Sequence, residues 1–243
     1  MLNSWVIRQS LVILCFVITI SGFSLASATT AFAQSNEPFG LSVVGAAPET
    51  ASPAMWKDLL LKIDRDLLVV AGCRAEPRSC SSNTAARFLT VVKEGEQKQG
   101  RNQIAHINRA ANLAIRALDS AHSENEWRSP LDILARGAGD CKHAAVLKYA
   151  ALREAGIDEN ALRIVVVEVR STHQQHAVVA VRTEGHWVLL DNHTSTLIES
   201  QAGFDYYDPL YALDQSGVRQ FALSPDAGPG STAQRLTLSR PAI

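Results

Sequence analysis

The sequence predicts an α+β fold in which N-terminal helices pack on an antiparallel β-sheet. Apolar residues recur at helical spacing over residues 55–155, and the period then changes to that of β-strands over residues 162–191. Hydrophobic residues make up 47% of the 243 residues and charged residues 19%, so the chain can build a sizeable core. The formal net charge of −1 gives no electrostatic reason to expect a nucleic-acid partner.

Five helices are expected before residue 156. The best marked follows Asp140, a favourable N-cap residue, and stops before Gly156. A shorter helix is started by Ser129-Pro130 and stopped by Gly137. The expected helices cover residues 55–71, 85–92, 104–118, 131–136 and 140–155.

Strands are expected after the last helix. Residues 162–169 (LRIVVVEV) are β-branched and almost continuously apolar, which predicts a central strand. Residues 176–182 and 186–191 are expected to form two more strands on either side of Glu184-Gly185, which is a hairpin signal. Residues 206–211 are expected to add a short edge segment. Because a hairpin joins antiparallel strands, we expect the sheet to be antiparallel.

Residues 1–33 have the pattern of a secretory signal peptide. Arg8 provides the positive start, residues 11–20 form an apolar run, and Ala31-Phe32-Ala33 places small residues where signal peptidase reads. The run is short for a membrane span, which needs about 20 residues, although an uncleaved anchor is the alternative. We therefore expect a periplasmic or secreted protein. The rest is expected to comprise an irregular arm, one catalytic domain and a flexible tail, over residues 34–52, 53–224 and 225–243.

Export to an oxidising compartment bears on the four cysteines. Cys15 leaves with the signal, so an odd number remains. Cys73 and Cys80 are close in sequence, and we expect them to form a disulfide, with two free thiols as the alternative. Cys141 is then the unpaired thiol of the exported protein.

Cys141 is a candidate nucleophile. It stands in the first turn of a predicted helix, where unpaired N–H groups and the helix dipole favour a thiolate. The preceding glycines, Gly137 and Gly139, let the backbone approach a substrate closely. The alternative is a small buried core cysteine, since free cysteine is among the most buried residue types.

His176 and Asp191 are the candidate partners of Cys141. A cysteine nucleophile needs a base within hydrogen-bond reach, and histidine is the usual one. A turn at residues 183–184 places the two directly opposite each other, whereas a turn at residues 184–185 makes them diagonal neighbours. Both of these registers put the side chains on one face of the hairpin, whereas a three-residue loop would not. Asp191 would then hold the imidazole in the required tautomer, with a strand-ending turn residue as the alternative.

Together these motifs resemble the bacterial transglutaminase-like cysteine proteinases, periplasmic relatives of transglutaminases and papain. The resemblance runs over residues 56–211 and is strongest over residues 127–192. It rests on Trp127-x-x-Pro130, Gly137-x-Gly139-Asp140-Cys141, Lys148-Tyr149, Gly156, LRIVVV, His176-Ala177-Val178 and Leu190-Asp191-Asn192, and on the helix that carries Asn108 and Asn112.

The resemblance implies a papain/transglutaminase-like fold and an exported thiol protease with the triad Cys141, His176 and Asp191. Trp127, Gly139 and Asp140 are the candidates for the substrate cleft, with ordinary core packing as the alternative for Trp127. The family includes the protease that releases large surface adhesins and so controls biofilm attachment. The implied partners are a protein substrate such as an adhesin and an inner-membrane regulatory receptor. The alternatives are a transglutaminase-type acyl transferase and a catalytically quiet binding module.

No cofactor and no metal site are expected. The adhesin-releasing members carry acidic residues after the nucleophile in a calcium-binding loop, whereas this chain has Lys142 and His143 there. Lysine offers no lone pair, and a histidine nitrogen is a poor ligand for a hard cation, so calcium is not expected. The scattered histidines lack the tight spacing of a zinc site.

Export and cysteine pairing can be tested together. We expect mass spectrometry of the exported protein to show an N-terminus near Gln34, a Cys73–Cys80 disulfide and one free thiol, because signal peptidase cuts after small residues and exported thiols oxidise. An intact Met1 in the exported material would instead indicate a membrane anchor.

Overall fold

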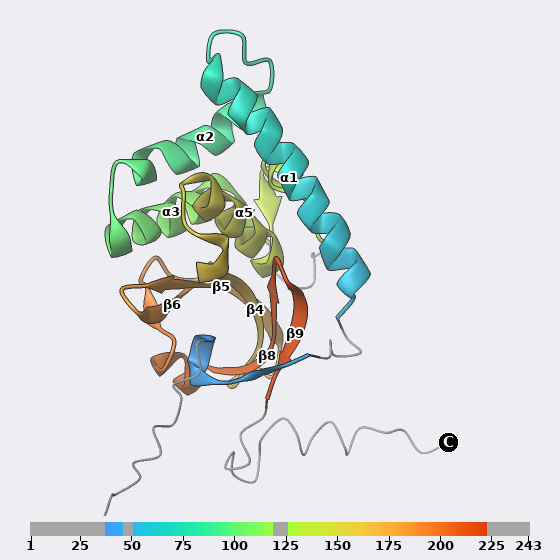
Figure 1. Ribbon diagram of the computed structural model, residues 1–243, viewed down its shortest axis with the longest axis vertical. Coiled ribbons are helices and arrows are strands. Elements are labelled where there is room, and N and C mark those ends of the chain that lie inside the picture. The colour runs from blue at the N-terminus through green and yellow to red at the C-terminus, as the bar shows by residue number, and fades with distance from the viewer. Residues whose placement is uncertain (1–36, 46–50, 119–125, 223–243) are drawn as a thin grey trace, which may run out of the picture. The chain divides into compact units, whose positions relative to one another are not determined.

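The helices lie together in the upper part of Figure 1, and the strands β4 to β9 follow the last helix in sequence. The computed structural model describes residues 37–45, 51–118 and 126–222. The expected signal peptide and tail lie outside the described residues. The five helices are α1 (Pro53–Ala75), α2 (Asn83–Glu96), α3 (Gly100–Ala114), α4 (Pro130–Arg136) and α5 (Cys141–Glu154).

The strands form a curved antiparallel sheet with the order β1-β9-β8-β4-β5-β6-β7 (Figure 1). The expected central strand, β4, is at its middle. The strands of this sheet are β1 (Val43–Val44), β4 (Leu162–Val169), β5 (Gln175–Thr183), β6 (His186–Leu190), β7 (Ile198–Glu199), β8 (Tyr207–Asp214) and β9 (Gly217–Phe221). The predicted α+β class is confirmed.

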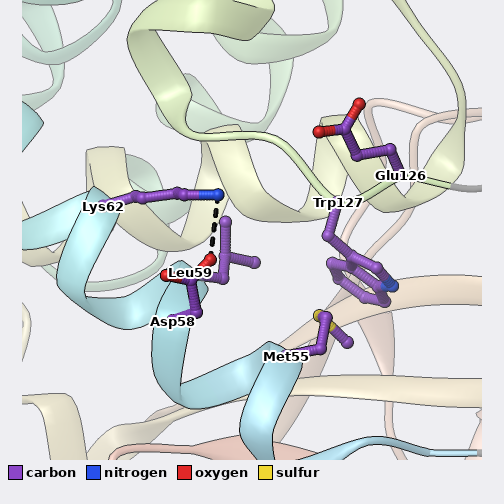
Figure 2. A pocket seen from close by; sticks show the side chains of 6 residues that line it. All are labelled: Met55, Asp58, Leu59, Lys62, Glu126 and Trp127. Atoms are coloured by element: carbon purple, nitrogen blue, oxygen red, sulfur yellow. Dashed lines mark ion pairs between the residues drawn. The ribbon is translucent and has the colours of Figure 1, made fainter.

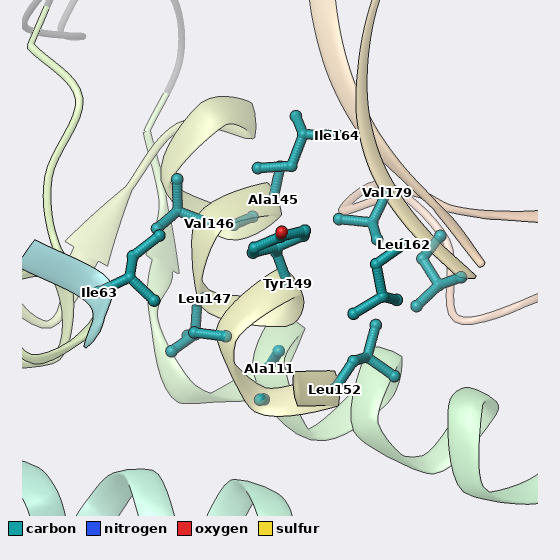
Figure 3. Packing of buried hydrophobic residues seen from close by; sticks show 14 of the residues in the cluster. Ile63, Ala111, Ala145, Val146, Leu147, Tyr149, Leu152, Leu162, Ile164 and Val179 are labelled. Atoms are coloured by element: carbon teal, nitrogen blue, oxygen red, sulfur yellow. The ribbon is translucent and has the colours of Figure 1, made fainter. Parts of the chain in front are cut away.

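Helix α5 is at the centre of the core. Ten consecutive residues, 143–152, are buried, so the helix is covered on every side. Tyr149 faces Ile164 of β4 and Val179 of β5, while Ile63 of α1 lies on the other side of the helix (Figure 3). A helix enclosed in this way cannot shift without opening cavities in a close-packed interior.

The helix expected over residues 104–118 ends earlier, at Ala114. Its last residues instead form β2 (Arg116–Ala117), which pairs in parallel with β3 (Ala138–Gly139) just before α5. The Arg116 N–H donates to the Gly137 carbonyl and the Leu118 N–H to the Gly139 carbonyl, both at 2.9 Å. This pairing satisfies backbone N–H and C=O groups that a continued helix would have satisfied within itself.

The expected irregular arm joins the sheet. Val43 and Val44 pair with Phe221 and Gln220 of β9. Phe39 is buried and contacts the rings of Phe204 and Phe221 in a second core cluster. A single aromatic residue between Pro38 and Gly40 carries no periodicity, so its burial is decided by tertiary contact.

The predicted disulfide is present. Cys73, in the last turn of α1, is joined to Cys80, in the loop before α2, and their Cα atoms are 4.6 Å apart. Cys141 is the free cysteine among the described residues. In this part of the chain no helix combines the length and the apolar character that crossing a membrane requires.

Reduction of the disulfide is expected to lower the free energy of unfolding by about 2–3 kcal/mol, the loss expected for a short closed loop. Urea unfolding of Cys141→Ala with and without a reductant measures this, since that variant has no other described thiol. The double variant Cys73→Ser/Cys80→Ser should match the reduced protein. A difference below about 0.5 kcal/mol, the size of an ordinary surface change, would contradict the expectation.

Candidate active site

Cys141 is the first residue of α5 and is half-buried. Asp140 caps this helix: its Oδ1 accepts hydrogen bonds from the N–H groups of Lys142 (3.1 Å) and His143 (3.2 Å). The His143 Nδ1 accepts in turn from the Asp140 N–H at 3.2 Å, which completes a capping box. The box and the burial of α5 hold the Cys141 side chain in place.

The hairpin turn is at Glu184-Gly185, as the second of the two considered registers requires. Thr183 pairs with His186 and Val179 with Leu190. Glu184 and Gly185 both have positive φ angles, 52° and 80°, which suits a two-residue type I′ turn. Extending this register by one residue makes Asp191 a diagonal neighbour of His176.

His176 and Asp191 are hydrogen bonded. The His176 Nε2 lies 3.0 Å from the Asp191 Oδ1, and both side chains are buried, with 7% and 3% of their surfaces exposed. A carboxylate only accepts, so Nε2 carries the proton. The Nδ1 nitrogen is then the one that can act on Cys141.

Asp191 is held by two further donors. The Tyr207 hydroxyl donates to its Oδ2, and the His193 N–H donates to its Oδ1 at 2.9 Å. Burial acts to raise the pKa of Asp191, but the bonds from His176, Tyr207 and His193 hold it well below its usual range. The Asn112 amide also donates to the Asp191 backbone carbonyl at 3.0 Å. The carboxylate is therefore ionised and fixed in position.

The imidazole is electrostatically coupled to both neighbours. Burial acts to lower the pKa of His176, but hydrogen bonding to Asp191 and to Cys141, together with their charges, raises it to about 9. The structure therefore brings the three predicted site residues together although 50 residues separate Cys141 from Asp191 in sequence. A thiol, a base and an orienting carboxylate in this order can carry out nucleophilic attack on a carbonyl.

Gly139 has a packing role. A Cβ atom at this position would lie 2.6 Å from the His143 Cβ and 3.3 Å from the Ile115 Cδ1. Such a contact is too close to be accommodated, because His143 is itself held by the capping box. The backbone at Gly139 therefore passes close to the side chains of His143 and Ile115. The sequence alone suggests a different reason for the glycine, the close approach of a substrate.

Trp127 lines an open pocket with the first turns of α1 (Figure 2). Its ring packs edge-on against Trp56 at 6.4 Å between centroids. The preceding residue, Glu126, accepts a hydrogen bond from the His143 Nε2 through its carbonyl at 3.0 Å, which ties this segment to the start of α5. Trp127 thus has both a packing contact and an exposed pocket beside it.

Tyr207 is a site residue that the sequence does not predict, because its spacing indicates only an edge segment over residues 206–211. A β-bulge between β4 and β8 explains why its contact with Asp191 is not predicted: Val166 pairs with Tyr211, whereas Val167 pairs with Pro209. The extra residue inverts the alternation of side chains, so Tyr207 and Tyr211 lie in different core clusters despite their even spacing.

Replacement Tyr207→Phe tests this arrangement. We expect the free energy of unfolding at pH 7 to fall by about 1–3 kcal/mol, because one buried carboxylate oxygen loses its donor. A carboxyl group with a lowered pKa stabilises the fold above its unfolded pKa, about 3.9, and this contribution is lost as the pH falls. Acid unfolding of the variant should therefore begin at a higher pH than that of the wild type.

The control is Tyr211→Phe in the same strand, because the Tyr211 hydroxyl makes no hydrogen bond to a described residue. Circular dichroism during urea and acid titrations measures both variants. Equal acid unfolding of the two variants would show that the Tyr207 hydroxyl does not act on Asp191.

The fold is similar to that of LapG from Legionella pneumophila. The calcium-bound LapG structure has a TM-score of 0.53 and 22% identity, and the match covers 70% of this chain and 99% of that chain. The EGTA-treated structure has the same TM-score and identity and covers 65% and 86%. This likeness confirms the predicted fold.

The expectation that no cofactor is involved is wrong. It rested on Lys142 and His143, yet a structure of this fold is described as calcium-bound. Calcium takes six to eight oxygen ligands, including backbone carbonyls and residues distant in sequence, so two side chains beside the nucleophile are too few to decide the matter.

The start of α5 does not fit calcium in the described structure. The Asp140 carboxylate is occupied by the Lys142 ammonium and by two backbone N–H groups. Over residues 37–45, 51–118 and 126–222, three or more His, Cys, Asp or Glu side chains do not come together in a group that could hold a metal ion.

A family model described as bacterial transglutaminase-like cysteine proteinase matches residues 68–213, which is more than half of the chain. Cys141, His176, Asp191 and Tyr207 all lie within the matched range. No curated protein sequence matches the chain. By this match the chain belongs to the bacterial transglutaminase-like cysteine proteinases and is a cysteine protease.

Proposed function

We propose that this protein is an exported endopeptidase that uses Cys141 as nucleophile, His176 as acid and base, and Asp191 as the residue that orients the imidazole. The observation that carries the proposal is the position of His176. Its Nε2 is bonded to Asp191, and its hydrogen bonding to Cys141 contributes to its raised pKa of about 9. A protonated imidazole at neutral pH can stabilise a thiolate and then supply a proton.

In the proposed reaction the Cys141 Sγ attacks the carbonyl carbon of a peptide bond. The C–N bond breaks, the leaving amine takes the proton of His176, and a thioester remains. Neutral His176 then removes a proton from a water molecule, which attacks the thioester and releases Cys141. Asp191 keeps its charge throughout and holds the imidazole by one hydrogen bond.

One backbone donor is free to stabilise the oxyanion. The first-turn N–H groups of Lys142, His143 and Ala144 are all bonded to Asp140. The Cys141 N–H makes no hydrogen bond to a described residue, and it belongs to the nucleophile itself. A donor in that place can approach the oxygen that becomes negative in the tetrahedral intermediate.

We further propose that the substrate is a protein of the periplasm or the cell surface, with a large adhesin as the first candidate. The family resemblance supports this, as it supports periplasmic location, a role in biofilm attachment and control by an inner-membrane receptor. Trp127 and its open pocket are the proposed place where a substrate side chain rests, because an aromatic wall beside exposed space suits an apolar group (Figure 2).

Three variants test the proposed triad. Cys141→Ala should abolish hydrolysis and keep the fold, because alanine is well tolerated in a helix. His176→Ala should be nearly as damaging, since the members of a catalytic unit are not additive. Asp191→Asn should cost less than His176→Ala, because its role is orientation.

Hydrolysis of fluorescently labelled casein and of p-nitrophenyl acetate measures these effects, with circular dichroism as the check on folding. Millimolar calcium is present in one series and EGTA in another, because a protein of this fold is described as calcium-bound. Full hydrolysis by Cys141→Ala in both series would end the proposal. Incorporation of an amine with release of ammonia, without new peptide ends, would indicate an acyl transferase instead.

A further inference from the structure

Lys148 is a buried charged residue for which the proposed mechanism has no use. Only 1% of its surface is exposed, and it is among the largest fully buried side chains of the described chain. The Lys148 ammonium has no hydrogen bond and no ion pair within 4 Å among the described residues. Lysine is almost never fully buried without a partner, so its presence here requires an explanation.

The position of Lys148 on α5 points it towards the site. It lies seven residues, close to two helical turns, after Cys141, so both side chains are on one face of the helix. Side chains on a helix lean back towards its N-terminus, and that end of α5 carries Cys141. The intervening residues on this face, Ala144 and Ala145, are small and leave room for the lysine stem.

Asp191 is the charged group whose field acts on Lys148. Burial lowers the pKa of Lys148 from 10.5 to about 7, and the negative charge of Asp191 opposes this shift. The titratable groups that in turn face Asp191 are His176 and Tyr207, and His176 faces Cys141. Lys148 is therefore coupled to the site through the carboxylate.

The charges of the site change during the proposed reaction, and the positive charge of Lys148 can balance them. Before attack, the thiolate and the imidazolium cancel, and Asp191 is balanced by Lys148. In the thioester intermediate, Cys141 and His176 are both neutral, and the buried carboxylate would have no cation without Lys148. An unpaired buried charge is costly, so a second cation keeps the site neutral at both stages.

Resting on the proposed triad, we propose that Lys148 is a positioning residue whose buried ammonium is the counter-charge of Asp191 while His176 is neutral. The residue does not touch the reacting atoms. Its cost to the fold supports a functional role, because a lysine whose pKa is lowered by burial destabilises the native state at every pH below its unfolded pKa of about 10.4.

The test compares Lys148→Met with the wild type between pH 5.5 and 8.5. Steady-state hydrolysis of p-nitrophenyl acetate is the readout, and Cys141→Ala supplies the blank. We expect about tenfold slower turnover in the variant at pH 6, the change equivalent to one pKa unit of charge interaction. The ratio should approach one above pH 8, where the wild-type lysine has lost its proton.

The matched control is Lys93→Met, which removes the charge of an exposed lysine of α2 and should leave the ratio near one at every pH. Lys148→Met should be at least as stable as the wild type in urea, because methionine fills a similar volume without a buried charge. If Lys148→Met does not fold, Lys148→Gln carries the same comparison.

A constant ratio across the pH range would overturn the inference, since a residue that only packs has no reason to titrate with the activity. Equal turnover at pH 6 would overturn it as well. In both cases hydrolysis by the wild type above the Cys141→Ala blank would leave the proposed triad intact. Wild-type turnover equal to that of the Cys141→Ala blank would contradict the proposed triad itself.

Discussion

The packing of α5 against β4 and β5 is the contact on which the candidate site depends. One end of this helix carries Cys141, and one end of β5 carries His176. Tyr149 of α5 lies between Ile164 and Val179 of the two strands (Figure 3). Because the interior is close-packed, a small slip of the helix would open cavities and cost several kcal/mol, on the order of 2–5 for one large side chain. The distance between thiol and imidazole is therefore set by core packing.

Polar contacts fix the orientation of the site residues that core packing brings together. Asp140 and His143 close the first turn of α5 from both sides, and Gly139 allows the chain to pass close to His143. On the sheet side, Asp191 accepts hydrogen bonds from His176, Tyr207 and a backbone N–H. The Asp140 and Asp191 carboxylates thus each accept at least two hydrogen bonds. Such restraints organise a site in advance of its substrate.

The buried ammonium of Lys148 reduces the stability of the fold. Lys148 is almost fully buried and has no ion-pair partner among the described residues. An apolar residue in its place would pack at no electrostatic cost. The arrangement is reasonable where activity needs a neutral interior at more than one stage of a reaction, since functional sites commonly trade stability for activity.

The sequence by itself determined the class of fold, the five helices, the central strand and the identity of the three candidate site residues. These follow from local signals: apolar spacing, the Asp140 cap, and a two-residue turn that keeps His176 and Asp191 on one face in either register. Each of these signals depends on only a few neighbouring residues, so it can be recognised without knowledge of the rest of the fold.

Only the tertiary structure decided the surroundings of Tyr207, Gly139 and Lys148. A bulge in β8 turns Tyr207 towards Asp191, and no spacing rule predicts where an extra residue enters a strand. Gly139 is required by a neighbour that folding brings close, and the burial of Lys148 depends on every element around α5. Calcium illustrates the same limit, because its oxygen ligands can come from segments distant in sequence.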